Sequence, residues 1–235
     1  MDLAIEVLLE LYSKKKLAYL FNFALENDRI SSENAMRIYH LREDYLKLVD
    51  KIIVFLQGNN ETLARQLCTD SFLPRASRFN QLDDMDWAFG NMGQQDKAKH
   101  LATLFLEDIS DFIIECIDEN FGFSRYAERL GMSANSFDDL YQELLKETTF
   151  IDTITLEILS KRIELTQPKL VCLSVPFPGN LYSAFRCAQF IKANYPGIAV
   201  AMGGGYPNTE LRSLKDKRVF EFVDYITLDD GELPI

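Results

Sequence analysis

Small and polar residues gather where three short apolar runs of the sequence end. These stretches are 174–180 (SVPFPGN), 203–208 (GGGYPN) and 229–232 (DDGE). Glycine lets a backbone approach a ligand closely, or take a positive φ, without steric cost. One glycine would suffice for a simple turn, so we interpret the glycines at 203–205 as room for a large, flat, uncharged ligand. No GxGxxG or GK[ST] pattern accompanies them, which argues against a phosphate cradle.

Cysteine and histidine, the usual ligands of clusters and zinc, are few and dispersed. No cysteine lies within four residues of another, their positions being Cys68, Cys116, Cys172 and Cys187. Because iron–sulfur clusters and structural zinc need nearby thiolates, we expect the cysteines to be small buried apolar residues. His40 and His100 fall inside predicted helices. We therefore predict no metal site.

Nucleophilic or acid–base catalysis has little support in the sequence. Ser174 does not lie in a GxSxG pattern, and no histidine is placed to activate it. The pairs Asp83–Asp84 and Asp229–Asp230 are adjacent in sequence, so their side chains point apart and we expect them to be solvated. We predict no catalytic residue, and an independent hydrolase is the weakest hypothesis.

Charge and hydropathy restrict the class of protein. The chain has 235 residues, 47% of them hydrophobic, and a formal net charge of −11. Such an acidic chain is poorly suited to nucleic-acid phosphates or to an anionic membrane surface. Its start has an acidic region where a signal peptide is basic, and its longest uncharged run is too short to span a bilayer. We expect a cytoplasmic protein without nucleic-acid or membrane partners.

From Pro168 onward the pattern alternates between strands and helices. We predict strands at 169–174, 198–202 and 224–228, with helices between them, the last over 208–215. The first two strands are continuously apolar, which is typical of burial on both faces. The helix between them carries Arg186 and Lys192 on the face opposite its apolar residues. A connection of this length implies a parallel pair, and ligands of open parallel sheets bind at the carboxyl ends of the strands.

Residues 1–167 are predicted to be helical. Apolar residues recur every three and four positions in two long segments, 31–56, with Ser31 as its cap, and 95–120. Shorter helices are predicted at 2–11, 14–27, 60–69, 134–146 and 150–165. Segment 70–94 has no steady period, and Trp87 and Phe89 in it either plug the core or line a ligand site. The predicted fold is α/β: a Rossmann-like (flavodoxin-like) parallel sheet over 168–235, with the helical region 1–167 preceding it or inserted in it.

Several short sequence features follow one another in a fixed order along 168–235. A strand ends in Ser174, a helix ends in Ile191-Lys192 before Pro196, the next strand ends in Gly203-Gly204, and Asp224-Tyr225 and Gly231-Glu232 follow. This series resembles the later half of the cobalamin-binding domain of radical SAM proteins. No single feature is specific, whereas their order and spacing together are.

The resemblance implies a cofactor surface and a partner. In the family, the positions that face cobalamin correspond to Ser174, Val175, Gly203, Gly204, Gly205 and Tyr206. Gly231 and Glu232 would lie at the junction with the radical SAM barrel, which binds a [4Fe–4S] cluster and S-adenosylmethionine. The barrel's CxxxCxxC motif does not occur in this sequence, and neither do the first strands of the family's sheet. The resemblance thus implies the amino-terminal part of a longer enzyme, with a large helical insertion and no radical chemistry of its own.

Two functions follow from these observations. The first is a cobalamin-binding-like module that positions cofactor or substrate in a larger radical SAM enzyme. The second is a helical interaction or substrate-positioning domain with a degenerate cofactor fold that no longer binds cobalamin. The large helical share supports the second, as does the lack of the Asp-x-His-x-x-Gly loop that supplies a histidine ligand in some cobalamin proteins.

Overall fold

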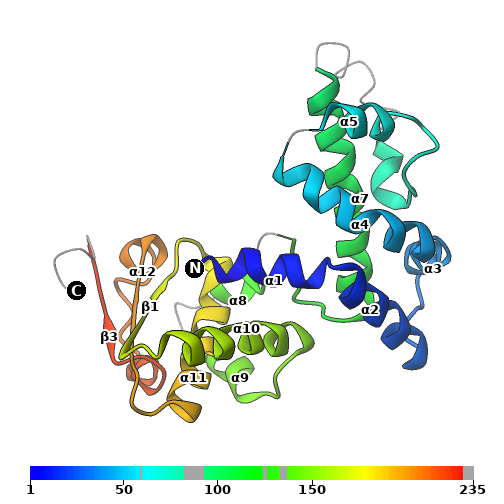
Figure 1. The fold of residues 1–235 in the computed structure, drawn as a ribbon. Coiled ribbons are helices and arrows are strands. Elements are labelled where there is room, and N and C mark those ends of the chain that lie inside the picture. Colours follow the sequence, from blue (N-terminus) through cyan, green and yellow to red (C-terminus); the bar gives the residue numbers. More distant parts are fainter. Residues whose placement is uncertain (59, 82–92, 124–125, 133–136, 230–235) are drawn as a thin grey trace. The chain divides into compact units, whose positions relative to one another are not determined.

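The structure, a computed structural model, describes residues 1–58, 60–81, 93–123, 126–132 and 137–229 (Figure 1). The chain divides into two compact units. The helical unit comprises residues 8–119, and the sheet unit comprises residues 1–7 together with 120–235. Each is described by itself below.

The helical unit is built from short, well-capped helices around one long helix. Its elements are the end of α1 (Leu3–Leu11), α2 (Lys14–Glu26), α3 (Glu33–His40), α4 (Arg42–Gln57), α5 (Glu61–Leu67), the 3₁₀ helix η1 (Ser77–Gln81) and α7 (Gln94–Cys116). The side chains of Ser13, Ser32 and Asn60 each accept a hydrogen bond from the third backbone amide of the helix that follows. Such caps satisfy amides that have no partner within the helix, which explains where α2, α3 and α5 begin.

The helix predicted over 31–56 is two helices, so this prediction was wrong in its middle. The cap is Ser32 rather than Ser31, and α3 ends at His40. Leu41 has a ψ of 6°, and its amide donates to the carbonyls of Arg37 and Ile38. The Arg42 side chain donates to the carbonyl of Tyr39 and stacks on that ring at 4.5 Å, which holds the break in place.

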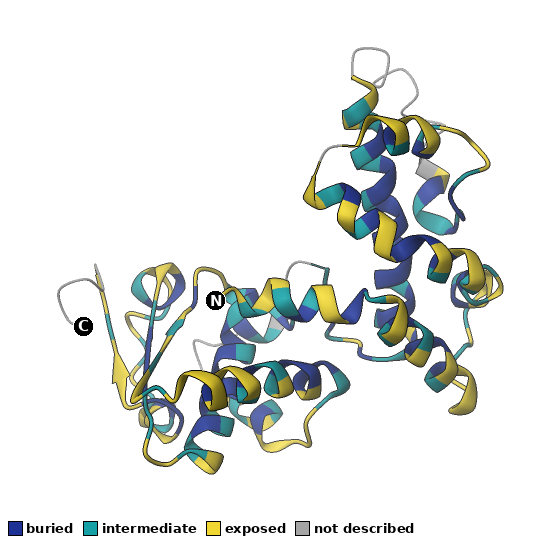
Figure 2. Ribbon diagram, in the orientation of Figure 1, coloured by how far each residue is buried: buried dark blue, intermediate teal, exposed yellow. Residues whose placement is uncertain are grey.

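Helix α7 forms the centre of the helical unit. It packs against α3, α4, α5 and η1, and most of its surface is buried (Figure 2). Its apolar residues contact aromatic side chains of the other helices. The ring centres of Phe112 and Phe21 are 4.8 Å apart, and those of Phe105 and Tyr45 are 5.0 Å apart. The prediction of a long helix over 95–120 is confirmed apart from its last turn.

The sheet unit combines helices with a small parallel sheet. Its elements are α8 (Glu128–Met132), α9 (Asp138–Leu145), α10 (Phe150–Thr166), β1 (Leu170–Ser174), the 3₁₀ helix η2 (Pro178–Asn180), α11 (Leu181–Asn194), β2 (Ala199–Gly203), α12 (Gly205–Thr209), the 3₁₀ helix η3 (Lys217–Glu221) and β3 (Tyr225–Ile226). The predicted α/β class is confirmed. Alternating strands and helices begin after α10. Helices α8, α9 and α10 nevertheless belong to the sheet unit, in which α10 packs against α11.

The sheet has the order β1–β2–β3, and both pairs are parallel. The predicted parallel pairing of the first two strands is therefore confirmed. Its register pairs Leu170 with Ala199 and Ser174 with Gly203, so β1 and β2 end side by side. The prediction of a helix over 208–215 was wrong for most of its length. Helix α12 begins at Gly205, because the turn at Gly204 leads directly from β2 into it, and it ends at Thr209.

Among the described residues, β1 is covered on one face and exposed on the other, whereas the central residues of β2 are buried. Val200 and Met202 are buried in a core with α11, and Val171 and Leu173 of β1 pack against the same core. On the opposite face, Leu170 and Cys172 are exposed. The prediction that β1 is buried on both faces, and with it the burial of Cys172, was wrong, because no described element covers that face.

The placement of Arg186 on the polar face of its helix was also wrong. Its exposed fraction is 3%, and its guanidinium lies among α9, α10 and α11. No helix within the described part of the chain is both long enough and apolar enough to cross a membrane.

Candidate functional site

Six of the predicted cofactor residues lie on two neighbouring backbone segments, 174–175 and 203–206, at the carboxyl ends of β1 and β2. The Val175 amide donates to the Gly203 carbonyl at 2.8 Å, and the Tyr206 amide donates to the Val175 carbonyl at 3.0 Å. Ser174 and Gly203 are register partners. The loop after β1 and the start of α12 are thus fastened to each other, and we call the surface formed by residues 174–175 and 203–206 the strand-end edge.

Packing within the chain accounts for two of the three glycines, Gly204 against backbone and Gly203 against a side chain. A Cβ at Gly203 would collide with the Oγ1 of Thr227. Gly204 has a φ of +108°, and a Cβ there would lie 2.8 Å from the amide nitrogen and 2.9 Å from the carbonyl oxygen of Val175. Such a φ is rarely adopted by other residues. The close approach of β2 to the loop after β1 therefore explains Gly203 and Gly204 without a ligand.

Gly205 is different, because packing leaves it open. It is exposed, and a Cβ there would meet only the Pro176 carbonyl, at 3.4 Å. Ser174 and Gly204 are exposed as well. These three residues give the strand-end edge a low, uncharged surface.

Val175 and Tyr206 form the buried support of this surface. Val175 is fully buried and the exposed fraction of Tyr206 is 9%. The Tyr206 hydroxyl donates to the carbonyl of Gly131 in α8 at 2.9 Å. Burial raises the pKa of this phenol, and the nearby Glu210 carboxylate adds to the effect, so the hydroxyl stays a neutral donor. Both residues hold the edge from below.

Polar contacts also hold helix α12, which follows the strand-end edge, against the segment after β3. The Asn208 side-chain oxygen accepts hydrogen bonds from the Arg212 guanidinium at 2.9 Å and from the Asp229 amide at 3.1 Å. Arg212 and Asp229 form an ion pair as well. Helix α12 is therefore tied to the segment after β3. Gly231 and Glu232, predicted to lie at a junction with a barrel, fall outside the described residues, as do Trp87 and Phe89.

Two further positions of the family resemblance meet in a structural contact. Lys192 at the end of α11 forms an ion pair with Asp224, whose other carboxylate oxygen accepts the Val200 amide at 2.8 Å. The Lys192 ammonium, followed by the Val200 amide, holds the pKa of Asp224 below its usual range. These two residues fasten α11, β2 and the start of β3 together.

Sequence reasoning missed a buried ionic cluster in the sheet unit. Arg186 lies 3.2 Å from the Asp152 carboxylate, and the Tyr182 hydroxyl donates to that carboxylate at 2.8 Å. Asp152 also completes a capping box with Thr149 at the start of α10. The available signal was a single charged residue, Arg186, within the apolar run of α11.

The exposed part of the strand-end edge fits one side of a flat ligand such as a corrin. Ser174, Gly204 and Gly205 are small, uncharged and exposed, and the support beneath them is held by hydrogen bonds. They are the described residues that would hold such a group. Comparisons with protein-family models, with curated proteins and with solved structures find no match to this chain.

Proposed function

We propose that the chain is a Rossmann-like, cobalamin-binding-like module of a larger radical SAM enzyme, in which the strand-end edge supports one side of the cofactor. The observation that carries the proposal is the register of β1 and β2. It brings Ser174 beside Gly203 at the carboxyl edge of a parallel pair, next to the exposed Gly204 and Gly205. Ligands of open parallel sheets bind at that edge.

Each exposed residue would act by position rather than by reaction. Gly204 and Gly205 keep the edge low, so that a broad ligand can approach the backbone, and Ser174 offers a hydroxyl that can donate or accept a hydrogen bond. A bound cobalamin supplies radical or group-transfer chemistry at its cobalt. The [4Fe–4S] cluster and S-adenosylmethionine belong to the barrel of the larger enzyme, which is the partner of this module.

The proposal is tested by retention of hydroxocobalamin. The chain is incubated with hydroxocobalamin, passed through a desalting column, and measured for corrin absorbance in the protein fraction. We expect the unmodified chain to retain corrin, and Gly205→Leu and Ser174→Leu to bind it at least about tenfold more weakly, because each adds bulk to the exposed edge. The matched control is Gly197→Leu, at an exposed glycine before β2 with no atom near its Cβ position. Equal binding by all variants would refute the assignment.

A second function is favoured by one specific observation. The backbone of Val175 and the side chain of Thr227 occupy the space beside Gly204 and Gly203, and Tyr206 is bonded to α8. This packing is what a cofactor fold retained for positioning alone would show. If the unmodified chain retains no corrin, the module is a substrate-positioning or interaction domain with a degenerate cofactor fold.

A further inference from the structure

Strand β1 lies at one side of the sheet and has a free edge in the described part of the chain, where it pairs with β2 alone. In a parallel pair, successive residues of a strand turn their amides and carbonyls alternately toward the neighbouring strand and away from it. The Lys169 carbonyl and the Val175 amide both bond to β2. The backbone groups of Leu170, Cys172 and Ser174 therefore face the opposite side, and we call the backbone of these three residues the lateral edge.

The side chains of the same three residues are exposed and uncharged. Exposure alternates along β1, so that Leu170, Cys172 and Ser174 are exposed while the two residues between them are half-buried. The exposed fraction of Leu170 is 40%. Side chains of paired strands contact one another across the pair, so a further strand on the lateral edge would also cover Leu170 and Cys172.

The lateral edge lacks the devices that keep edge strands from pairing. Native proteins protect such edges with short strands, charged side chains or proline. Strand β1 has five residues, and none of them is charged or is proline. The opposite outer strand, β3, has only two residues and directly follows Asp224, which forms an ion pair with Lys192. Of the two outer strands of the described sheet, β1 is thus the one suited to accept another strand.

The lateral edge is also complementary to itself. Two copies related by a two-fold axis at Cys172 would place their β1 strands antiparallel. Cys172 then lies opposite Cys172 of the second copy, and Leu170 lies opposite Ser174 of the second copy. Each of these residues offers both an amide and a carbonyl, so ladder hydrogen bonds can form at every pair. No two charged side chains are placed opposite each other in these pairs.

We propose that the lateral edge of β1 pairs with the lateral edge of a second copy of this chain, in antiparallel orientation, so that one sheet continues through a symmetric dimer. Backbone hydrogen bonds form the contact, and Leu170 of each copy packs beside the strand of the other. Such an isologous contact uses the same surface of both copies and closes at the dimer. The inference goes beyond the proposed function, and its test uses no cofactor, so the two proposals succeed or fail separately.

The test measures the mass of the full chain by size-exclusion chromatography with light scattering over a wide range of concentration. We expect the mass of two chains at high concentration and of one chain on dilution. Leu170→Lys places a charge beside the lateral edge and should raise the dissociation constant of the dimer at least about tenfold. Because each copy has a net charge of −11, the copies repel each other, and added salt should strengthen the dimer.

The position of the two-fold axis is tested by cross-linking. Cys172 is exposed and would lie beside its counterpart in the second copy. A short bismaleimide should therefore link two unmodified chains, and Cys172→Ser should remove this link. Cross-linking by Cys172→Ser equal to that by the unmodified chain would overturn the proposed pairing.

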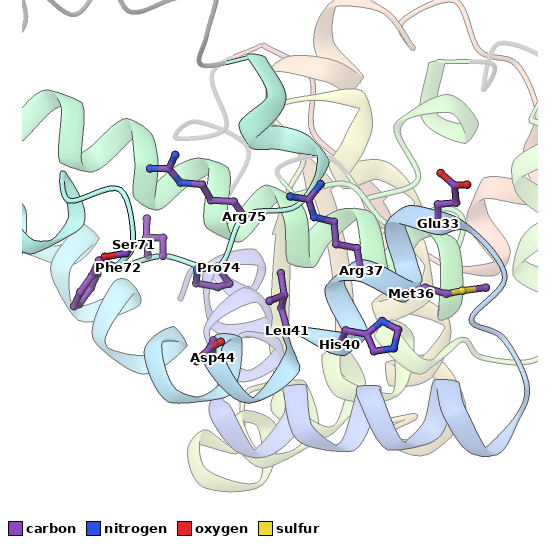
Figure 3. A pocket seen from close by; sticks show the side chains of 11 residues that line it. Glu33, Met36, Arg37, His40, Leu41, Asp44, Ser71, Phe72, Pro74 and Arg75 are labelled. Atoms are coloured by element: carbon purple, nitrogen blue, oxygen red, sulfur yellow. The ribbon is translucent and has the colours of Figure 1, made fainter.

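The matched control is Met36→Lys, which should leave the dissociation constant unchanged. Met36 has an exposed fraction of 44%, close to that of Leu170, and belongs to the helical unit. It lines a groove of about 740 Å³ formed by α3, the start of α4 and segment 71–75 (Figure 3). Circular dichroism checks that both lysine variants fold. The proposal is overturned if the chain is single at every concentration, if it forms larger assemblies, if Leu170→Lys and Met36→Lys associate alike, or if salt dissociates the dimer.

Discussion

Replacing Arg186 with methionine tests the buried cluster that joins three helices of the sheet unit. Its guanidinium meets the Asp152 carboxylate at 3.2 Å and the Tyr182 hydroxyl at 2.8 Å. It also donates to the carbonyls of Leu144 at 2.9 Å and Glu143 at 3.1 Å, at the end of α9. Methionine fills a similar volume but supplies no donor and no charge, so all four groups lose the guanidinium at once. Among the contacts of the described residues, Asp152 then keeps the neutral donors of Tyr182 and Thr149, so its charge loses the guanidinium as counter-ion.

The cost follows from the burial of the pair. Arg186 and Asp152 have exposed fractions of 3% and 2%, so water cannot replace the missing guanidinium. Removing one partner of such a pair costs about 3–5 kcal/mol. A domain of ordinary stability has about 5–15 kcal/mol in total, so the sheet unit should lose a large part of its free energy of unfolding. Asp152→Asn should cost less, since Arg186 keeps its carbonyl acceptors.

Hydrogen exchange measured by mass spectrometry locates the effect. Arg186→Met should speed amide exchange in peptides of α9, α10 and α11 and leave peptides of α7 unchanged, because α7 belongs to the other unit. The double variant with Asp152→Asn should be less destabilised than the sum of the two single variants. A change below about 1 kcal/mol for Arg186→Met, the scale of an exposed ion pair, would refute this account of the cluster.

Three further substitutions test other contacts. Gly204→Ala should lower the free energy of unfolding of the sheet unit by about 2 kcal/mol or more in urea denaturation, because the new Cβ would sit at a positive φ and collide with the Val175 backbone. The control Gly197→Ala should change it by less than about 0.5 kcal/mol, and equal effects of the two substitutions would contradict this account. Asp108→Asn should cost about 1–3 kcal/mol in the helical unit, measured by urea denaturation, since an amide nitrogen then faces a donor. Lys192→Met should raise the pKa of Asp224 toward its ordinary value in an NMR titration. In the unmodified chain, the lowered pKa of Asp224 stabilises the fold at any pH above the ordinary pKa of an aspartate. This stabilisation is lost as the pH falls through the pKa that Asp224 has in the folded chain. The variant lacks it, so it should lose less stability on acidification.

The features that sequence reasoning predicted well are set by local patterns. Pro168 and the apolar runs after it located β1 and β2, and the length of the connection between them required a parallel pair. The long helix α7 was evident from its repeating apolar residues. Both signals depend only on neighbouring positions, so one sequence suffices to read them.

The errors lie where distant residues decide the outcome. Arg186 resembles a surface residue in its helix, but the carbonyls that bury it come from α9, more than forty positions away in the sequence. The break at Leu41 interrupts an apolar period that continues unchanged on both sides. Leu170 and Cys172 read as buried because they are apolar, although the structure describes nothing that covers them.

The three consecutive glycines show how one sequence motif can have several physical causes. Gly203 makes room for the Thr227 side chain, and Gly204 makes a turn with positive φ against the Val175 backbone. Neither contact involves a ligand, so Gly204 would be needed whether or not a cofactor binds, and the neighbouring Thr227 side chain is reason enough for Gly203. Only Gly205 has no comparable internal reason, since a side chain there would meet a single carbonyl at ordinary contact distance. The case for a ligand at the strand-end edge therefore depends on Gly205 and the exposed Ser174, which is why substitutions at these two positions, rather than at Gly203 or Gly204, separate a cofactor surface from a fold that is merely well packed.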